Sequence, residues 1–353
     1  MDAELVRELA ALALGPAGVN AISGDSLVVS PVSVETELAH AIRDEALERG
    51  IQIAEPGRGT VQRVIIVKTW KDAGAKVDAS PELFRDGWPC PSTALPAPTD
   101  DWVESRGGGD LGSFIDALRA AFRLNEVDPE ASWVKRHDFL ADVTERLEGL
   151  HIRSLHFAGA GGLTDLTVPI ATSSIWNSGR ALTRDRVTFA PNLPCEEIFA
   201  APDWRGVRGT ALISRPFSWG TGSVEGGELT VRFDGTDGVN IPDAPRSLVE
   251  KLGGRLEGVH IGEVALVDGA SAAANAGVEG FGETILDENS GSHLAFGCAL
   301  PMSYTDPAAA DIHREGNHLD FVIGTDDMVV TAQTDEGELV LLDRGKWADE
   351  VTA

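Results

Sequence analysis

The first part of the chain alternates short apolar strands with amphipathic helices, and this alternation constrains the fold more than any other feature of the sequence. Strands that are apolar throughout and separated by helices are typical of a parallel sheet in an α/β protein. Strands are predicted over residues 26–30, 51–54 and 64–68, and helices over 34–49, 112–122 and 134–147. We therefore predict a Rossmann-like parallel α/β domain, with an irregular connection over 75–110, where Pro, Asp and Ser are frequent.

The second part of the chain has a different texture, with short strands separated by turns. This pattern predicts an α+β domain with a curved, mainly antiparallel sheet. Predicted strands lie over 166–170, 186–189, 209–213, 228–233, 264–266, 319–323 and 329–331, and a helix over 245–252. Because 353 residues exceed what one ordinary core accommodates, we place a domain boundary near the small-residue run at 158–162 and predict domains over 1–157 and 158–353.

Net charge excludes two classes of partner. The chain has 56 acidic and 29 basic residues and a formal charge of -27. Nucleic acids and anionic membrane surfaces are bound through basic patches, so neither is an expected partner. No apolar run approaches the roughly 18 residues of a membrane span. The amphipathic start is unlike a signal peptide, and three widely spaced cysteines fit a reducing cytoplasm.

A histidine and a carboxylate stand two residues apart in an apolar segment near the C-terminus. His318 and Asp320 are followed by Phe321, Val322 and Ile323, which predict a strand. Side chains two apart on a strand point to the same face, so the pair forms half of a metal site. The alternative is a surface His–Asp pair on a half-exposed strand.

Further acids and imidazoles lie in apolar or turn contexts upstream. Glu196 and Glu197 are adjacent in a segment bounded by prolines, so at most one of them points inward; Glu263 enters an apolar strand, and His293 follows a polar turn. Several carboxylates and imidazoles that converge repel one another unless a cation is present, and two divalent ions that share carboxylates remove this difficulty. The alternative is that each buried acid pairs with an arginine.

Four ordered motifs resemble the M29 family of metallo-aminopeptidases. They are Asn-Leu-Pro-x-Glu-Glu-Ile-Phe-x-Ala-Pro at 192–202, Gly-Glu-Val-Ala-Leu-Val at 262–267, Asp-Glu-Asn-x-x-x-His-Leu-Ala-x-Gly at 287–297 and His-x-Asp-Phe-x-Ile-Gly at 318–324. The resemblance implies a cytoplasmic, dimeric exopeptidase that acts on peptides or amino-acyl substrates. The implied ligands of two divalent ions (zinc, cobalt or manganese) are Glu197, Glu263, His293, His318 and Asp320.

The resemblance also implies how the chemistry is divided. One metal would hold the free N-terminus and the carbonyl, and a water activated by both metals would attack. Glu263 would shuttle the proton. The family has a Tyr seven residues after the third motif's histidine, where this chain has Leu300. Tyr304, the single tyrosine, is the expected substitute for that phenol.

Two other functions fit the sequence. A branch with this fold resembles the ring-cleaving dihydroxypyridine dioxygenases, which use Fe(II), and His260, His318 and Asp320 would supply the two histidines and one carboxylate. A single-iron site would not need Glu197 and Glu263 as ligands. The third possibility is a peptidase-like binding protein without turnover.

Overall fold

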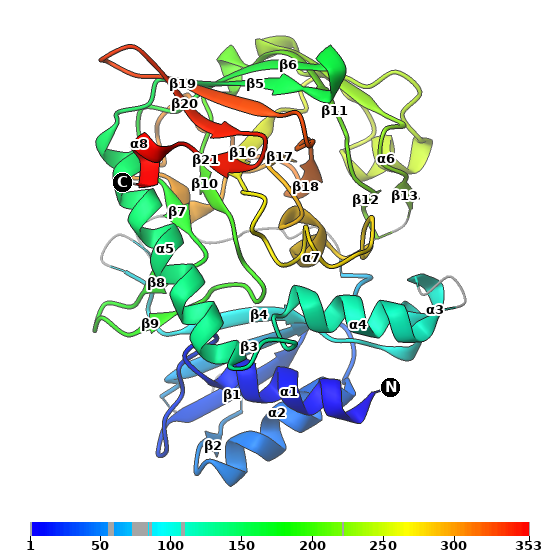
Figure 1. Cartoon of the computed structure of the whole chain (residues 1–353), viewed down its shortest axis with the longest axis vertical. Helices are drawn as coiled ribbons and strands as arrows, with labels where there is room; N and C mark the ends of the chain where they lie inside the picture. Colours follow the sequence, from blue (N-terminus) through cyan, green and yellow to red (C-terminus); the bar gives the residue numbers. More distant parts are fainter. Residues whose placement is uncertain are drawn as a thin grey trace.

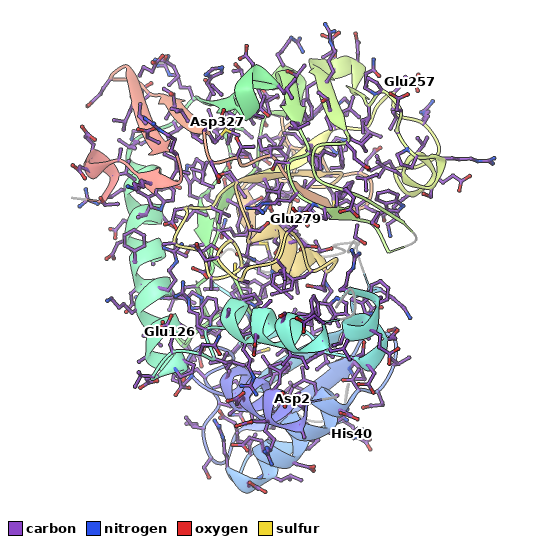
Figure 2. The ribbon with its side chains drawn as sticks, turned by 45° about the vertical axis from the view of Figure 1, so that its right-hand side comes forward. Asp2, His40, Glu126, Glu257, Glu279 and Asp327 are labelled. Atoms are coloured by element: carbon purple, nitrogen blue, oxygen red, sulfur yellow. The ribbon has the colours of Figure 1, made fainter. Side chains whose placement is uncertain are left out.

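The computed structural model describes residues 2–55, 60–72, 84, 87–106, 110–220 and 222–352. A small sheet with its helices forms one end of the molecule and larger sheets form the other, with the long helix α5 (Pro129–Gly149) along one side (Figure 1). In Figure 2, Asp2 and His40 mark the first end and Glu257 and Asp327 the other.

The N-terminal sheet is parallel, as predicted. Its order is β2-β1-β3-β4, and each neighbouring pair is parallel. Two helices, capped by the side chains of Asp2 and Thr36, pack their apolar residues into the same core as strands β1 and β3. These elements are β1 (Ser26–Pro31), β2 (Gln52–Ile53), β3 (Arg63–Lys68), β4 (Ser92–Pro96), α1 (Ala3–Leu14) and α2 (Glu37–Glu48).

The stretch 75–110 is not irregular throughout, and this prediction is wrong for the part that the structure describes. It contains β4 and the helix α3 (Asp100–Arg106). β4 is only five residues long and ends at a proline, so its sequence lacks a clear strand pattern. Its conformation comes from pairing with β3, whose Val64 lies opposite Ser92.

α5 joins the two main apolar cores of the molecule. Asp128 caps its start by accepting a hydrogen bond from the Ala131 amide, and Pro129 occupies its first turn. Near its start, Trp133 belongs to the core that also contains the helix α4 (Leu111–Ala121). Further along, Leu140, Val143 and Leu147 belong to the core under the larger sheets.

The larger of the two main sheets in the second half has eight strands. Its order is β15-β14-β11-β6-β5-β19-β20-β21, and its pairs are antiparallel. Its strands are β5 (Ser154–Gly159), β6 (Thr164–Pro169), β11 (Arg208–Leu212), β14 (Thr230–Asp234), β15 (Val239–Asn240), β19 (Val329–Gln333), β20 (Glu338–Asp343) and β21 (Lys346–Trp347). The predicted boundary at 157/158 cuts through β5, which pairs with β6 and β19. The division of the chain into two domains stays a prediction.

A five-stranded antiparallel sheet, in the order β18-β17-β16-β10-β7, provides the scaffold for the candidate site. β16 and β17 are buried at every position, so they lack the alternation that marks a strand in sequence. The helix α7 (Thr284–Glu288) packs against β18. The strands are β7 (Asn177–Ser178), β10 (Ile198–Ala200), β16 (Ile261–Leu266), β17 (His293–Phe296) and β18 (Leu319–Val322).

Short elements complete the chain. They are β8 (Ala181–Leu182), β9 (Thr188–Phe189), β12 (Phe217–Ser218), β13 (Ser223–Val224), α6 (Arg246–Lys251) and α8 (Asp349–Thr352). Within the described ranges, no helix has both the length and the apolar character that crossing a membrane requires.

A buried histidine on α5 makes the stability of the protein depend on pH. His137 is buried beside Trp133, and burial lowers its pKa to about 4, whereas an unfolded chain titrates histidine near 6.5. Between these values the unfolded state binds the extra proton, so stability falls as pH falls from 6.5 to 4. The loss from this residue reaches about 3 kcal/mol.

We expect His137→Leu to lose less stability than the wild type over that pH range. The measurement is urea unfolding of both metal-free proteins at pH 7, 6, 5 and 4.5, with the difference between the two free energies plotted against pH. Parallel curves would show that His137 is not held neutral in the fold.

Candidate metal centre

The register of the five-stranded sheet places four predicted ligands on one face. Glu263 lies opposite Ala295 on β17, and Ala295 lies opposite Asp320 on β18. Directly opposite residues in an antiparallel pair share a face, and so do residues two apart along a strand. His293 precedes Ala295 by two residues, and His318 precedes Asp320 by two. The small Ala295 side chain leaves room between the two acids.

The fifth ligand reaches the same face from the other side of β16. Phe199 on β10 lies opposite Ala265, which follows Glu263 by two residues. Glu197 precedes Phe199 by two residues, so its side chain points to the same face as that of Glu263. Four neighbouring strands or strand ends thus direct all five predicted ligands to one place.

Glu263 lies between two groups of ligand atoms. The first group is Glu197, Glu263 and His293, and the second is Glu263, His318 and Asp320; in each, the ligand atoms lie within 4.8 Å of one another. The Nε2 atom of His293 is 2.9 Å from Glu197 Oε2 and 3.5 Å from Glu263 Oε1. The Nε2 atom of His318 is 3.7 Å from Glu263 Oε2 and 3.1 Å from Asp320 Oδ1.

The hydrogen bonds of the cluster fit a metal ion. Glu197 Oε2, Glu263 Oε2 and His293 Nε2 are buried without a hydrogen-bond partner in the part of the chain that the structure describes. The Nδ1 atoms of His293 and His318 lie 3.2 and 2.8 Å from the carbonyl oxygens of Gly291 and Cys298. A carbonyl only accepts, so Nδ1 carries the proton and each Nε2 lone pair faces the acids, as in metal-binding histidines.

The electrostatics of the cluster also call for a cation. Burial opposes protonation of His293, but Glu197 and Glu263 outweigh it and raise the pKa of His293 well above its usual value. Burial raises the pKa of Glu263. Burial likewise opposes a charge on His318, yet Asp320 raises the pKa of this imidazole well above its usual value. Protons thus gather where divalent ions would supply the positive charge.

Glu288 is a further acid of this site that the sequence analysis did not single out. It is buried at the end of α7, and its carboxyl shares a hydrogen bond with Asp320. Burial, and then the nearby Asp320 and Glu197, raise the pKa of Glu288 well above its usual value. It occurs in the third motif, but a sequence does not show that α7 packs on β18.

Glu196 points away from the cluster but into a buried ion network, so the expectation that at most one of the two acids points inward is wrong: both are buried. Its Oε2 accepts hydrogen bonds from Arg136 Nε at 2.6 Å and Arg123 Nη2 at 2.7 Å. Arg136 also binds both carboxylate oxygens of Asp268, at 2.7 and 3.0 Å. The Glu196 amide donates to the Asn289 side chain, beside Glu288. Loss of Glu196 would leave Arg136 and Arg123 short of a partner.

The three residues of the iron alternative do not come together in the structure. His260 packs against Trp204 and His313, with ring centroids 4.2 and 5.1 Å away. It belongs to neither group of ligand atoms, and burial lowers its pKa to about 4. The assignment of His260 as an iron ligand is therefore wrong: the strand register shifts between Ile261 and Glu263, and His260 packs against Trp204 and His313.

Leu300 and Tyr304 differ in their relation to the site. Leu300 lines the cavity in front of the cluster. Tyr304 is buried in a separate small apolar cluster with Ala171, Ala299 and Ile312. Tyr304 is not among the cavity-lining residues of the described chain. The catalytic role of Tyr304 stays a prediction.

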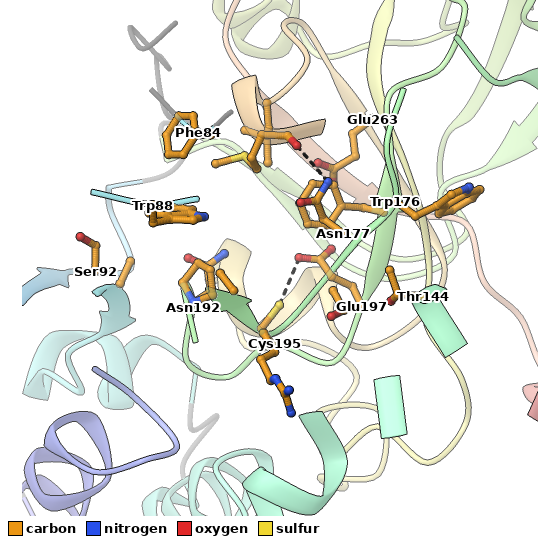
Figure 3. Close-up of a pocket in the computed structure, with 18 of the residues that line it drawn as sticks. Phe84, Trp88, Ser92, Thr144, Trp176, Asn177, Asn192, Cys195, Glu197 and Glu263 are labelled. Atoms are coloured by element: carbon orange, nitrogen blue, oxygen red, sulfur yellow. Dashed lines mark hydrogen bonds between the residues drawn. The ribbon is translucent and has the colours of Figure 1, made fainter. Parts of the chain in front are cut away.

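A cavity of about 1100 Å³ opens in front of the cluster. Figure 3 shows Glu197 and Glu263 on one side and Trp88 and Phe84 on the other. The Trp88 ring packs against Phe84 and Phe189, with centroids 4.8 and 5.3 Å away. The cavity therefore lies between the metal-binding face of the five-stranded sheet and an aromatic wall from the N-terminal part of the chain.

The fold and the site together define an α/β protein with a buried carboxylate–imidazole cluster that could hold metal ions. The family model described as "Thermophilic metalloprotease (M29)" matches residues 90–347, and the chain belongs to this family. This confirms the resemblance seen in the motifs.

Relatives agree with this membership, and a solved structure shares the fold. Aminopeptidase T of Thermus aquaticus is 34% identical over 240 residues, which cover 65% of this chain and 58% of the relative. Aminopeptidase 2 of Geobacillus stearothermophilus is 30% identical over 303 residues, which cover 80% and 70%. The structure described as wild-type AmpT from Thermus thermophilus has the same fold, with a TM-score of 0.75 and 23% identity over 98% of this chain and 99% of that one. The sequence match to Aminopeptidase T thus spans less than two thirds of that relative.

Proposed function

We propose that this chain is a metal-dependent aminopeptidase that removes the N-terminal residue of peptides with the help of two divalent ions. The main support is that Glu263 is shared by two groups of three potential ligands at one wall of a large cavity. A shared carboxylate is the usual bridge between two ions about 3.5–4 Å apart. The aminopeptidase names of the relatives support the same reaction.

The donor set limits the metals that the site would hold. Glu197 and His293 would bind one ion, His318 and Asp320 the other, and Glu263 both. Carboxylate and imidazole donors suit zinc, cobalt and manganese. When bound, such ions polarise a carbonyl oxygen and lower the pKa of a coordinated water.

The acids of the chain would handle the proton of the attacking water. Glu263 is assigned the shuttle role because it faces both ligand groups. Glu288 is a second acceptor or a further ligand, because it is buried beside Asp320 and lines the cavity. Both acids are buried close to where the water would be bound, which is the position that a proton acceptor requires.

The family resemblance also predicts that the protein is a homodimer and that it is located in the cytoplasm. The formal charge of -27 favours substrates with a free, positively charged amine through the long-range field.

The test combines metal analysis with two substrates. We expect about two ions per chain, hydrolysis of leucyl amide, and no hydrolysis of its N-acetylated form. O₂ consumption with hydroxylated pyridines is the comparison assay, and one iron with O₂ uptake would overturn the proposal. Metal-loaded protein without turnover of any unblocked amide would instead support the inactive homologue.

We expect Leu300→Tyr to raise kcat/KM for leucyl amide, by about 10²-fold at most. Leu300 lines the cavity but has no donor for a developing oxyanion, and one such donor is typically worth about 10²–10³ in rate. If Tyr304 already fills this role, Leu300→Tyr has no effect and Tyr304→Phe lowers the rate by that factor instead.

Leu300→Phe is the matched control, since it adds the ring without the hydroxyl. A gain that appears equally in Leu300→Phe and Leu300→Tyr would mean that ring size, not hydrogen bonding, is responsible. Metal content is measured for each variant, so that a change in loading is not mistaken for a change in rate.

A further inference from the structure

We propose that the side-chain oxygen of Asn177 accepts a hydrogen bond from the free α-amine of the substrate. This contact would make the enzyme prefer substrates whose N-terminus is unblocked. The inference rests on the proposed aminopeptidase function. The α-nitrogen of an N-terminal residue lies two bonds from the scissile carbonyl carbon, about 2.5 Å away. An acceptor for the amine must therefore line the cavity directly beside the metal ligands.

The register of the sheet places Asn177 there. Asn177 on β7 lies opposite Phe199 on β10. Because Glu197 precedes Phe199 by two residues, Asn177 and Glu197 point to the same face. Asn177 lines the cavity, and Figure 3 shows it between Glu197 and Glu263.

The orientation of the Asn177 amide is set by two carbonyl groups. Its Nδ2 donates to the oxygens of Ile175 and Met302, each at 3.1 Å. Carbonyl oxygens only accept, so the nitrogen must face them and Oδ1 must point the other way.

The oxygen of Asn177 is available to a ligand. No hydrogen bond within the described residues ends on Oδ1, and this oxygen is not among the buried polar atoms that lack a partner. With respect to the described residues, Oδ1 is therefore neither bonded nor buried, and it is open to the solvent of the cavity that Asn177 lines. Holding the amide by its nitrogen presents an acceptor whose direction is fixed before the substrate binds.

Other polar groups of the cavity are less suited to this task. The ligand carboxylates are committed to the metals, and Glu197 Oε1 also accepts from the Cys195 thiol at 3.4 Å. Ser92 lies on the opposite wall, beside Trp88 (Figure 3). Glu148 is exposed and accepts from the Trp176 amide. An α-amine keeps at least two N–H donors whether it is protonated or bound to a metal, so Asn177 can act in either case.

The test compares two ligands that differ only in the amine. Leucine hydroxamate and 4-methylpentanoyl hydroxamate share the metal-binding group and the side chain, and only the first has the α-amine. Their dissociation constants are measured by calorimetry on metal-loaded wild type, Asn177→Ala and, as a control, Ser92→Ala. Asn177→Leu, which keeps the branched shape, replaces Asn177→Ala if the latter does not fold.

We expect loss of the Asn177 oxygen to raise the dissociation constant of leucine hydroxamate by about 10- to 100-fold. This is the usual value of a hydrogen bond to a charged group. The amine-free ligand should bind as before, and Ser92→Ala should leave both constants unchanged. An equal rise in the dissociation constants of both ligands would mean that Asn177 has a purely structural role, through its contacts with Ile175 and Met302. No weakening of either ligand would also overturn the inference.

Binding is measured without turnover, so this inference and the proposed function can fail separately. A wild type that hydrolyses no unblocked amide contradicts the proposed function. A working wild type whose preference for the amine is unchanged by substitution of Asn177 contradicts only the assignment of this residue.

Discussion

Glu263→Gln is expected to lose metal and to lower kcat/KM for leucyl amide by on the order of 10³-fold or more. The carboxylate of Glu263 is shared by both ligand groups, so its loss removes a ligand from each. Without the ions, the attacking water returns toward its bulk pKa of about 16 from about 7. Metal content per chain and steady-state kinetics measure the effect, and His318→Ala and Asp320→Ala should behave similarly.

A thermal unfolding measurement adds a readout that does not depend on activity. Adding zinc or manganese should raise the Tm of the wild type, because an ion that binds only the folded state stabilises it. Glu263→Gln should lose this shift. In the metal-free form it should be at least as stable as the wild type, since it no longer buries one of several acids that repel one another.

Glu283→Gln is the matched control for this prediction. Glu283 is also a buried glutamate, and burial raises its pKa, but it caps α7 and belongs to neither ligand group. This variant should keep both metals and the metal-dependent rise in Tm. Full metal content and full turnover in Glu263→Gln would show that the proposed centre is wrong.

Arg136→Met is expected to lower the free energy of unfolding by about 3–5 kcal/mol. Arg136 is buried between Glu196 and Asp268, and the substitution leaves both carboxylates without their main partner. Breaking a buried ion pair on one side costs about this much, because an uncompensated charge stays in the interior. Urea unfolding at pH 7 measures the loss.

An exposed arginine on another helix provides the control. Arg246 pairs with Glu250 one turn later on α6, where both side chains are exposed. Exposed pairs of this kind contribute about 0.3–0.5 kcal/mol, so Arg246→Met should change stability little. Equal losses of stability in the two variants would mean that the buried network of Arg136, Glu196 and Asp268 contributes no more to the free energy of unfolding than a surface ion pair.

The ion network also gives a physical reason for the position of Glu197. Glu196 is held on its far side by Arg136 and Arg123, and its own amide binds Asn289. Adjacent residues of an extended segment point to opposite sides, so fixing Glu196 in the interior directs Glu197 to the metal face. Glu196→Gln is therefore expected to act mainly on stability, whereas Glu263→Gln acts mainly on metal binding.

The local parts of the site could be predicted from the sequence because they depend on spacing alone. His318 and Asp320 share a face since side chains alternate along a strand, and the structure brings their ligand atoms to 3.1 Å. The same alternation separated Glu197 from Glu196. The apolar strands and helices of the first part likewise predicted a parallel sheet, because burial on both faces leaves a recognisable run of apolar residues.

What the sequence did not reveal depends on pairing between distant segments. β4 is a strand because β3 lies beside it, and β17 is one because β16 and β18 enclose it. Glu288 reaches the cluster only through the packing of α7 on β18. His260 is close to Glu263 in the sequence, yet packing separates it from the cluster, because its ring lies against Trp204.

The sequence by itself determined the family to which the chain belongs, and it predicted the kind of metal ligands and their order along the chain. Only the tertiary structure decided that four strands align their registers so that the five ligands meet, that Arg136 lies behind Glu196, and that Asn177 faces the cavity. The physical reason is that alternation and helical period are properties of neighbouring residues, whereas strand register and side-chain pairing are selected by the packing of the whole chain.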